Sequence, residues 1–416
     1  MTVQTLIESA WGPVNLSAEQ AERLRELGRR LASDKSWWGS GPNDDEPSGT
    51  VIRCERVSGA AHRVRVSDAI GVIGVGDTQI VVEPKIPLDH LVFLLQQADQ
   101  IPRIADQSTG LPIGASFHDL ISRWFLASAE QLLRRGLLSD YSARFDDLRA
   151  ARGRVQVLPT TRAVLTGRPV IHCEFDEFSI DSALNRILRA AASLTASSVG
   201  LESGLRLRAT QLTSRIEPVT ALRPSDLREG LDRRSAYYRD AITLARCIIS
   251  GHAGTLGIGE VAAGTFLFRT PEAVEEGIRR ILASELQGHC RVHKTGLSIS
   301  GARKRRLNPD LVFNDNEAIG DVKYAVLGNG LKRSHIYQLT TFATGYRASS
   351  ALLVGFGDQA TTDHAYVGDV RIDALNWDLA AASPRLAAAS LADSVLTWWR
   401  RSESAEVHEQ ERYATA

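Results

Sequence analysis

Two aspartates and a lysine stand at a spacing that could serve phosphoryl transfer. Asp310 opens one short apolar run, and Asp321 and Lys323 close a second one. The Asn/Asp-rich residues 314–317 separate the two runs, which predicts a β-hairpin. Because side chains two apart in a strand share a face, Asp321 and Lys323 should project together, and strand pairing can bring Asp310 beside them. We therefore expect two carboxylates and one ammonium group on one side of a sheet.

This trio suits metal-dependent cleavage of a phosphodiester bond. Carboxylate oxygens are the ligands that Mg²⁺ prefers, and Mn²⁺ accepts the same donors. Such an ion lowers the pKa of a bound water and stabilises charge on a phosphoryl group, while the lysine positions the water and the phosphate. Since an Asp-x-Lys triplet is frequent by chance, a plain hairpin with a surface ion pair is the competing interpretation.

The residues before the hairpin predict a helix that could add a third carboxylate. Thr270-Pro271 favours a helix start, because threonine is a frequent N-cap and proline fits the first helical position. The apolar stripe of this helix places Glu275 at the edge of its buried face, whereas Glu276 points outward and can pair with Arg280. Glu275 is therefore a candidate metal ligand, and the alternative is an ion pair with Arg279.

Further elements complete a recognisable order around the hairpin. Residues 289–300 indicate a strand or bent hairpin, residues 331–346 a helix that carries Gln338, and residues 350–356 a buried strand. Residues 365–373 predict one more strand. The order is thus helix, strand, strand, strand, helix, strand. Gln338 could hold a DNA backbone or brace the site.

Six cations flank this order and could contact a nucleic-acid backbone. Four of them lie directly before the hairpin and two open the following helix: Arg303, Lys304, Arg305, Arg306, Lys332 and Arg333. A basic loop beside a phosphate-cleaving centre would neutralise backbone charge. The alternative is a loop whose charges are simply solvated.

The N-terminal half predicts a β-rich segment followed by helices. Residues 50–87 alternate short apolar runs with Gly and Asp, which is typical of a small sheet. The glycines at residues 71–76 do not form GxGxxG and favour a hairpin turn over a nucleotide loop. Residues 117–136 predict a helix that ends at a glycine. Asp181 is expected to cap the helix at residues 183–196, with a second carboxylate site as the alternative.

Composition places the chain among ordinary globular proteins. Its 416 residues include 49 Lys+Arg and 49 Asp+Glu, so the formal net charge is zero. This balance excludes a histone-like protein but not a local basic groove. The four cysteines are scattered, which favours neither a disulfide framework nor a zinc ribbon. With no signal-peptide pattern and no apolar run of membrane-spanning length, we expect a cytoplasmic protein without a membrane partner.

The motifs resemble two known patterns. Asp310, Asp321 and Lys323 match the PD-(D/E)XK nuclease superfamily, whose core has the element order given above. The wider sequence resembles the McrC family, the nuclease subunits of McrBC-type 5-methylcytosine-dependent (type IV) restriction systems. Gln338 with Phe342 resembles a QxxxY element in which phenylalanine replaces tyrosine. The other matching segments, between about residue 60 and residue 345, are GVIGVGD, IVVEPKIP, RGRV, CEFDEFSID, LNRIL and VEE.

The resemblance implies an α+β multidomain fold. Its nuclease core would be a mixed sheet flanked by helices, preceded by a small β-rich domain and a helical region. The expected parts are an N-terminal β-rich docking domain at 1–105, a mostly helical middle region at 106–255, a PD-(D/E)XK nuclease domain at 256–380, and a C-terminal helix and tail at 381–416.

The resemblance also implies a function that depends on a partner. A Mg²⁺-dependent DNA endonuclease subunit of this kind, part of an antiviral defence system, cuts DNA when joined to a hexameric AAA+ GTPase, McrB, whose GTP hydrolysis it stimulates and which recognises modified cytosine. Because the chain lacks a GxxxxGK[ST] motif, GTP would enter only through the partner. Asp310, Asp321 and Glu275 would ligate the metal, and Lys323 would orient the water.

Two other functions remain open from the sequence. One is an adaptor that activates a GTPase while cutting DNA weakly or not at all, and the intact Asp/Asp/Lys set disfavours it. The other is a stand-alone DNA repair nuclease of the same superfamily. A neighbouring gene for an AAA+ GTPase would distinguish the restriction subunit from the repair nuclease.

Overall fold

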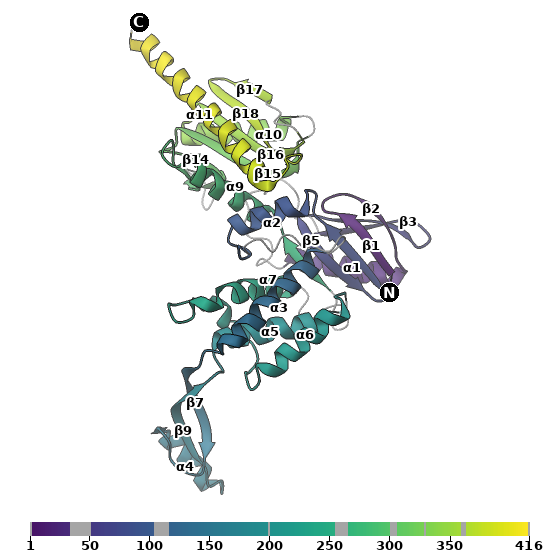
Figure 1. The fold of residues 1–416 in the computed structure, drawn as a ribbon, viewed down its shortest axis with the longest axis vertical. Coiled ribbons are helices and arrows are strands. Elements are labelled where there is room, and N and C mark those ends of the chain that lie inside the picture. The colour runs from purple at the N-terminus through teal and green to yellow at the C-terminus, as the bar shows by residue number, and fades with distance from the viewer. Residues whose placement is uncertain are drawn as a thin grey trace. The chain divides into compact units, whose positions relative to one another are not determined.

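The computed structural model confirms the α+β class (Figure 1). It describes residues 2–33, 51–103, 116–198, 200–253, 265–299, 306–327, 330–358 and 363–414. The loop predicted at residues 39–48 lies outside these ranges. The chain forms two compact units, one of residues 1–117 with 254–416 and one of residues 118–253. None of the described helices is both long enough and apolar enough to span a membrane.

The first unit contains the β-rich region predicted near the N-terminus. A four-stranded sheet has the order β1 (Thr2–Ile7), β6 (Thr78–Glu83), β5 (Ala69–Val75) and β10 (Phe266–Arg269). A three-stranded sheet has the order β2 (Gly12–Asn15), β4 (Ala61–Val66) and β3 (Ile52–Ser58). Helix α1 (Ala18–Ser33) adds three fully buried leucines to their core: Leu24, Leu27 and Leu31.

Two glycines of the residue 71–76 segment have conformations that explain their presence. Gly76 has a φ of +64° in the turn between β5 and β6, which confirms the predicted hairpin turn. Gly71 has a φ of +136°, and a Cβ built there would lie 2.1 Å from the backbone oxygen of Phe266. The glycine therefore lets β10 pair closely with β5, although β10 follows β5 by nearly 200 residues.

A six-stranded mixed sheet forms the C-terminal part of the first unit. Its order is β11 (Val292–His293), β14 (Leu311–Phe313), β15 (Ala318–Val326), β16 (Ser350–Gly357), β18 (Val370–Asp378) and β17 (Asp363–Val367). The antiparallel pair β14–β15 confirms the predicted hairpin, and β15, β16 and β18 run parallel. The single strand predicted at residues 365–373 is wrong: a turn at Gly368 splits this stretch into β17 and β18.

Helices cover both faces of this sheet. Helix α10 (Arg333–Tyr346) packs Leu339 and Phe342 against one face. Helix α11 (Pro384–Ala414) covers the opposite face, where Trp399 stacks on Phe313. Buried Phe342 thus fills the core at the position where the resembled motif has tyrosine. The remaining elements of this unit are α2 (Leu88–Gln97), α9 (Pro271–Glu285) and the short pair β12 (Leu297–Ser298) and β13 (Arg306–Leu307).

The second unit combines helices with a small sheet, two strands of which lie in the stretch of residues 151–181, whose short apolar runs indicate strands. Its helices are α3 (Phe117–Arg135), α4 (Val157–Leu165), α5 (Ala183–Ser197), α6 (Ser203–Arg215), α7 (Arg239–Ala253) and the 3₁₀ turns η2 (Asp226–Arg228) and η3 (Ala236–Tyr238). The three-stranded antiparallel sheet has the order β7 (Asp140–Leu148), β9 (Ile171–Ser179) and β8 (Arg154–Val155). Within this unit, Figure 1 shows β7, β9 and α4 extending away from the helical bundle.

Candidate active site

The hairpin places the two predicted aspartates directly opposite each other. Leu311 pairs with Gly320, so the preceding Asp310 lies across from Asp321. Both are buried, with 6% and 3% of their surface exposed. The backbone N–H of Val322 donates to Asp310 Oδ2 at 3.1 Å, which fixes one carboxyl against the strand that carries the other. The convergence inferred from strand periodicity is present in the structure.

Lys323 joins this pair from the same face of β15. Its Nζ lies 2.7 Å from Asp321 Oδ2. Burial disfavours the charged ammonium, but the neighbouring carboxylates, Asp321 above all, outweigh this and raise the pKa of Lys323. The pairing of β15 with β16 shifts register between Val322 and Val326. Such bulges redirect side chains beside functional sites, and this one falls directly at Lys323.

Glu275 approaches the aspartates from helix α9. Burial raises its pKa, and the charges of Asp310 and Asp321 raise it further, while Lys294 acts in the opposite direction. Burial likewise raises the pKa of Asp321, partly offset by Lys323. The alternative pair of Glu275 with Arg279 is not formed, because Arg279 pairs with Glu276. Three carboxyls therefore share one poorly solvated region.

Lys294 is a member of the site that sequence reasoning missed. It follows β11, and its Nζ donates to Asp310 Oδ1 at 2.7 Å. Its side chain is 41% exposed, compared with 24% for Lys323. No motif marks Lys294, because it comes from a loop outside the hairpin and reaches Asp310 only through the pairing of β11 with β14.

The other predicted site residues are further from this centre or outside the described ranges. Gln338 lies on α10, and its amide makes no hydrogen bond to another described residue. Lys332 and Arg333 are exposed at the start of α10. His335, in the same turn, lies close enough to Lys323 for the two to interact electrostatically. The exposed Arg306 donates from Nη2 to the Gly296 backbone oxygen at 2.8 Å. Three further predicted cations lie outside the described residues: Arg303, Lys304 and Arg305.

The donor set suits a hard divalent cation. Glu275, Asp310 and Asp321 offer oxygen ligands, which Mg²⁺ prefers. Buried Asp321 Oδ2 has, besides its ion pair, no hydrogen bond of good geometry to the described residues. In the described ranges, no three acidic, histidine or cysteine side chains are already close enough together to hold a metal ion. The acids thus supply suitable ligands without yet forming a closed cage.

A further buried acid, Glu8, lies between the N-terminal sheet and the start of α9. Glu8, directly after β1, is 1% exposed and accepts a hydrogen bond from the Thr270 hydroxyl. Burial raises the pKa of Glu8, and the nearby charge of Lys85 partly offsets this rise. The Lys85 Nζ also lies 4.0 Å from the centroid of the Tyr324 ring. Thr270 is the N-cap of α9, but its hydroxyl contacts Glu8 rather than capping the helix. Glu8 thus contacts the residue that begins α9, and Lys85 beside it contacts Tyr324 on β15.

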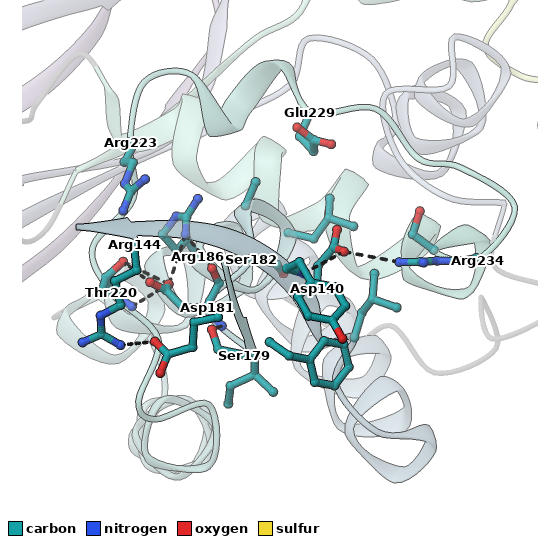
Figure 2. A pocket seen from close by; sticks show the side chains of 18 of the residues that line it. Asp140, Arg144, Ser179, Asp181, Ser182, Arg186, Thr220, Arg223, Glu229 and Arg234 are labelled. Atoms are coloured by element: carbon teal, nitrogen blue, oxygen red, sulfur yellow. Dashed lines mark hydrogen bonds and ion pairs between the residues drawn. The ribbon is translucent and has the colours of Figure 1, made fainter. Parts of the chain in front are cut away.

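The acidic stretch before α5 serves structure in the second unit. Ser182, not Asp181, is the N-cap of α5, so the predicted cap was one residue off. Figure 2 shows Asp181 between Arg186 and Thr220, with the Thr220 hydroxyl 2.9 Å from Asp181 Oδ2. Arg186 also makes a two-bond pair with Asp226, at 2.8 and 3.0 Å. Arginine thus neutralises these acids, which argues against a second carboxylate site.

These residues border a cavity of about 730 Å³ in the second unit. None of the candidate active-site acids or lysines lines this cavity. Its lining combines apolar and polar residues with charged ones, among which Arg144 pairs with Glu177 and Arg234 with Asp140. Nearby, Asn185 accepts a hydrogen bond from the buried Tyr238 hydroxyl at 2.8 Å. The asparagine and arginine of the LNRIL segment therefore hold the unit together.

One known structure shares the fold of this chain, and a second is similar over part of it. A chain in the refined half-complex from the tetradecameric assembly of Thermococcus gammatolerans McrB AAA+ hexamers with bound McrC is 17% identical, with a TM-score of 0.65 over 95% of this chain and 99% of that chain. A chain in the cryo-EM structure of the Thermococcus gammatolerans McrBC complex is 16% identical, with a TM-score of 0.47 over 69% of this chain and 89% of that chain. No curated protein matches the sequence.

A match to a family model shows the family of this chain, which a similar fold at such low sequence identity does not. The model described as McrBC 5-methylcytosine restriction system component matches residues 64–354, well over half of the chain. The match runs from the N-terminal sheet through the second unit to β16 and includes every candidate active-site residue. The resemblance to the McrBC family noted from the sequence is confirmed. The chain belongs to the family of McrBC 5-methylcytosine restriction system components.

Proposed function

We propose that this chain is the DNA-cleaving subunit of a modification-dependent restriction complex. The observation that carries the proposal is the convergence of Glu275, Asp310, Asp321 and Lys323 in one buried corner of a mixed sheet. An adaptor has no need for three crowded carboxylates, which destabilise one another unless a cation neutralises them. The order of the strands and helices around the corner supports a PD-(D/E)XK nuclease core.

The roles proposed for these residues follow from their chemistry. Asp310, Asp321 and Glu275 would hold Mg²⁺ or Mn²⁺ after small side-chain rotations. The bound cation would supply a water of lowered pKa and stabilise charge on the phosphoryl oxygens. Lys323, held in place by Asp321 and by the bulge in β15, would orient the attacking water and the scissile phosphate. These arguments support a metal-dependent endonuclease.

The substrate backbone would be held by cations around this corner. Lys332 and Arg333 lie exposed at the start of α10. This turn lies near Lys323, because His335 within it interacts electrostatically with Lys323. The exposed Arg306 lies in the same unit. Phosphate contacts from lysine and arginine position DNA without reading its sequence. Recognition of modified cytosine is therefore assigned to the partner.

The proposed partner is a hexameric McrB-like AAA+ GTPase. Family membership and the printed description of the fold relative, McrB AAA+ hexamers with bound McrC, support this choice. The chain lacks a GxxxxGK[ST] motif, so the partner would bind the GTP.

Exposed apolar residues favour the second unit as a docking surface for that partner. Seven large apolar side chains on β7, β9 and α4 are each more than half exposed: Tyr141, Phe145, Val157, Leu158, Val164, Leu165 and Phe178. Clustered exposed apolar residues of this kind mark protein interaction sites. This observation adds the second unit to the N-terminal domain expected from the sequence.

Plasmid cleavage tests the proposal directly. Methylated and unmethylated plasmids are incubated with Mg²⁺ and GTP, with and without the AAA+ protein encoded nearby. We expect cleavage of methylated plasmid only when the chain, its partner, GTP and Mg²⁺ are all present. Cleavage by the chain alone would instead establish a stand-alone nuclease. Accelerated GTP hydrolysis without any cleavage would establish an adaptor.

A further inference from the structure

Lys294 differs from the other cation of the site in how it is held. Its ammonium donates to Asp310 Oδ1 at 2.7 Å, but 41% of its side chain is exposed. Lys323, in contrast, extends from the middle of the sheet and its side chain is 24% exposed. A lysine on a flexible stem at the open edge of a site can move away at little cost. The contact with Asp310 is therefore the more easily broken of the two.

The contact between Lys294 and Asp310 affects the charge that a metal ion would meet at the site. Three carboxyls from Glu275, Asp310 and Asp321 lie together, and Lys294 is one of two ammonium groups that contact them. Arg279 on α9 pairs with Glu276, and its charge also acts on Asp310 and Glu275 from a greater distance than an ion pair. Lys294 thus neutralises the aspartate that the sequence motif assigns to the metal, and it does so from the solvent side.

We propose that Lys294 is a displaceable counter-ion that competes with the divalent cation for Asp310 and, once displaced, contacts the phosphate backbone of DNA. The proposal rests on the proposed function of the site as a metal-dependent nuclease centre. It assigns Lys294 two alternating partners of the same charge, a carboxylate and a phosphodiester. Cation binding and DNA binding are thereby coupled through one side chain.

Cation binding without DNA separates this role from a merely structural one. Mn²⁺ binding to the full chain is measured by calorimetry for the wild type and for Lys294→Met. Losing a charge-assisted hydrogen bond frees Asp310, so the variant should bind Mn²⁺ about tenfold more tightly. A structural lysine would give unchanged or weaker binding when it is removed, and either result would overturn the proposal.

Arg291→Met provides the matched control. Arg291 lies three residues before Lys294, is 67% exposed and pairs with the surface carboxylate of Asp315. Its removal takes one positive charge from the same segment without touching the candidate site. We expect Arg291→Met to bind Mn²⁺ like the wild type. Equal tightening in both variants would mean that general charge, not the Asp310 contact, sets the affinity, and would overturn the proposal.

A DNA-binding measurement tests the second half of the proposal. With Ca²⁺ in place of Mg²⁺ to prevent cleavage, Lys294→Met should bind duplex DNA several-fold more weakly than the wild type, whereas Lys294→Arg should retain binding. Unchanged DNA affinity in Lys294→Met would overturn this half.

The failure of the inference and the failure of the proposed function give different results. If Asp310→Asn binds Mn²⁺ as well as the wild type, the metal site itself is wrong, and the proposed function and this inference fail together. If Lys294→Met tightens Mn²⁺ binding but the wild type never cuts DNA, the competition stands and the nuclease activity fails.

Discussion

At the scale of residues, the site depends on carboxyls that repel one another when ionised. Glu275 and Glu276 are neighbours on α9, yet only Glu275 meets the aspartates, whereas Glu276 pairs with Arg279 and Arg280. Helical periodicity predicted this difference, because 100° of rotation separates the two side chains. The hairpin acids were predictable for a similar reason, since a short turn fixes which residues pair. Lys294 was not predictable, because its position depends on the pairing of β11 with β14, which local sequence does not reveal.

Glu275→Gln tests the role of the helix acid. The amide keeps the shape of a side chain whose pKa is raised to about 9 by burial and by the neighbouring aspartates, so folding should not suffer. A cation at the site would lose an anionic ligand, and the Mg²⁺ concentration for half-maximal cleavage should rise about 10- to 100-fold. Titration of Mg²⁺ in the plasmid assay measures this shift. Glu276→Gln is the matched control and should cleave like the wild type; an equal defect in both would refute a specific role for Glu275.

At the scale of elements, close backbone approaches fix where α9 carries its acid. Gly277 lies on the helix side that faces α2, and a Cβ there would lie 2.5 Å from the Leu94 backbone oxygen. A glycine inside a helix is unfavourable on propensity alone, so the sequence pattern gives no reason for it. The reason is tertiary, as it is for Gly71 beside β10. Such contacts between distant segments cannot be read from local periodicity.

Gly277→Ala should therefore destabilise the first unit. The added methyl group collides with backbone that cannot rotate away, and overpacking of this kind costs about 1–3 kcal/mol. The displaced helix should also lower cleavage, because Glu275 lies two residues before Gly277. Urea unfolding measures the stability change. Gly204→Ala on α6 is the control, since its Cβ would meet only Glu202 Oε1 at 3.6 Å; if both variants are equally stable, the close-approach explanation is wrong.

At the scale of the whole molecule, the chain leaves the first unit, forms the second and returns. The returning strand β10 completes the N-terminal sheet and leads directly into α9. A linear succession of domains was expected from the sequence, because composition along the chain does not reveal that β10 pairs with β5. Strand β7 of the second unit was also missed, because its polar and charged residues lie in a stretch that was expected to be mostly helical. The helical elements, with their strong apolar periodicity, were predicted more faithfully.

The second unit should lose stability in acid through one buried ion pair. The hydrogen bonds from Arg186 hold the pKa of Asp226 below its ordinary value of 3.8. This lowered pKa contributes stability that is fully present above about pH 4 and is lost as the pH falls through the folded-state pKa.

Asp226→Asn measures that contribution. Arg186 would keep only Asp181 as a charged partner, and the loss of its charge-assisted bonds to Asp226 should cost about 2 kcal/mol at pH 7. The difference from the wild type should shrink at pH 3, where the wild type has begun to lose the same stabilisation. Hydrogen–deuterium exchange of α5 and α7 amides reports on this unit alone. Asp176→Asn, an exposed acid on β9, serves as control; a pH-independent difference for Asp226→Asn would contradict the assignment.

The most direct test of the central claim is a comparison of two activities in one reconstituted complex. Asp321→Asn is assembled with the AAA+ partner, and cleavage of methylated plasmid and hydrolysis of GTP are measured in the same sample. Because a metal centre of this kind supplies several kcal/mol of transition-state stabilisation, cleavage should fall by roughly three orders of magnitude, while stimulated GTP hydrolysis stays at the wild-type rate. Cleavage near the wild-type level, or loss of both activities together, would contradict the assignment of this corner as the catalytic site.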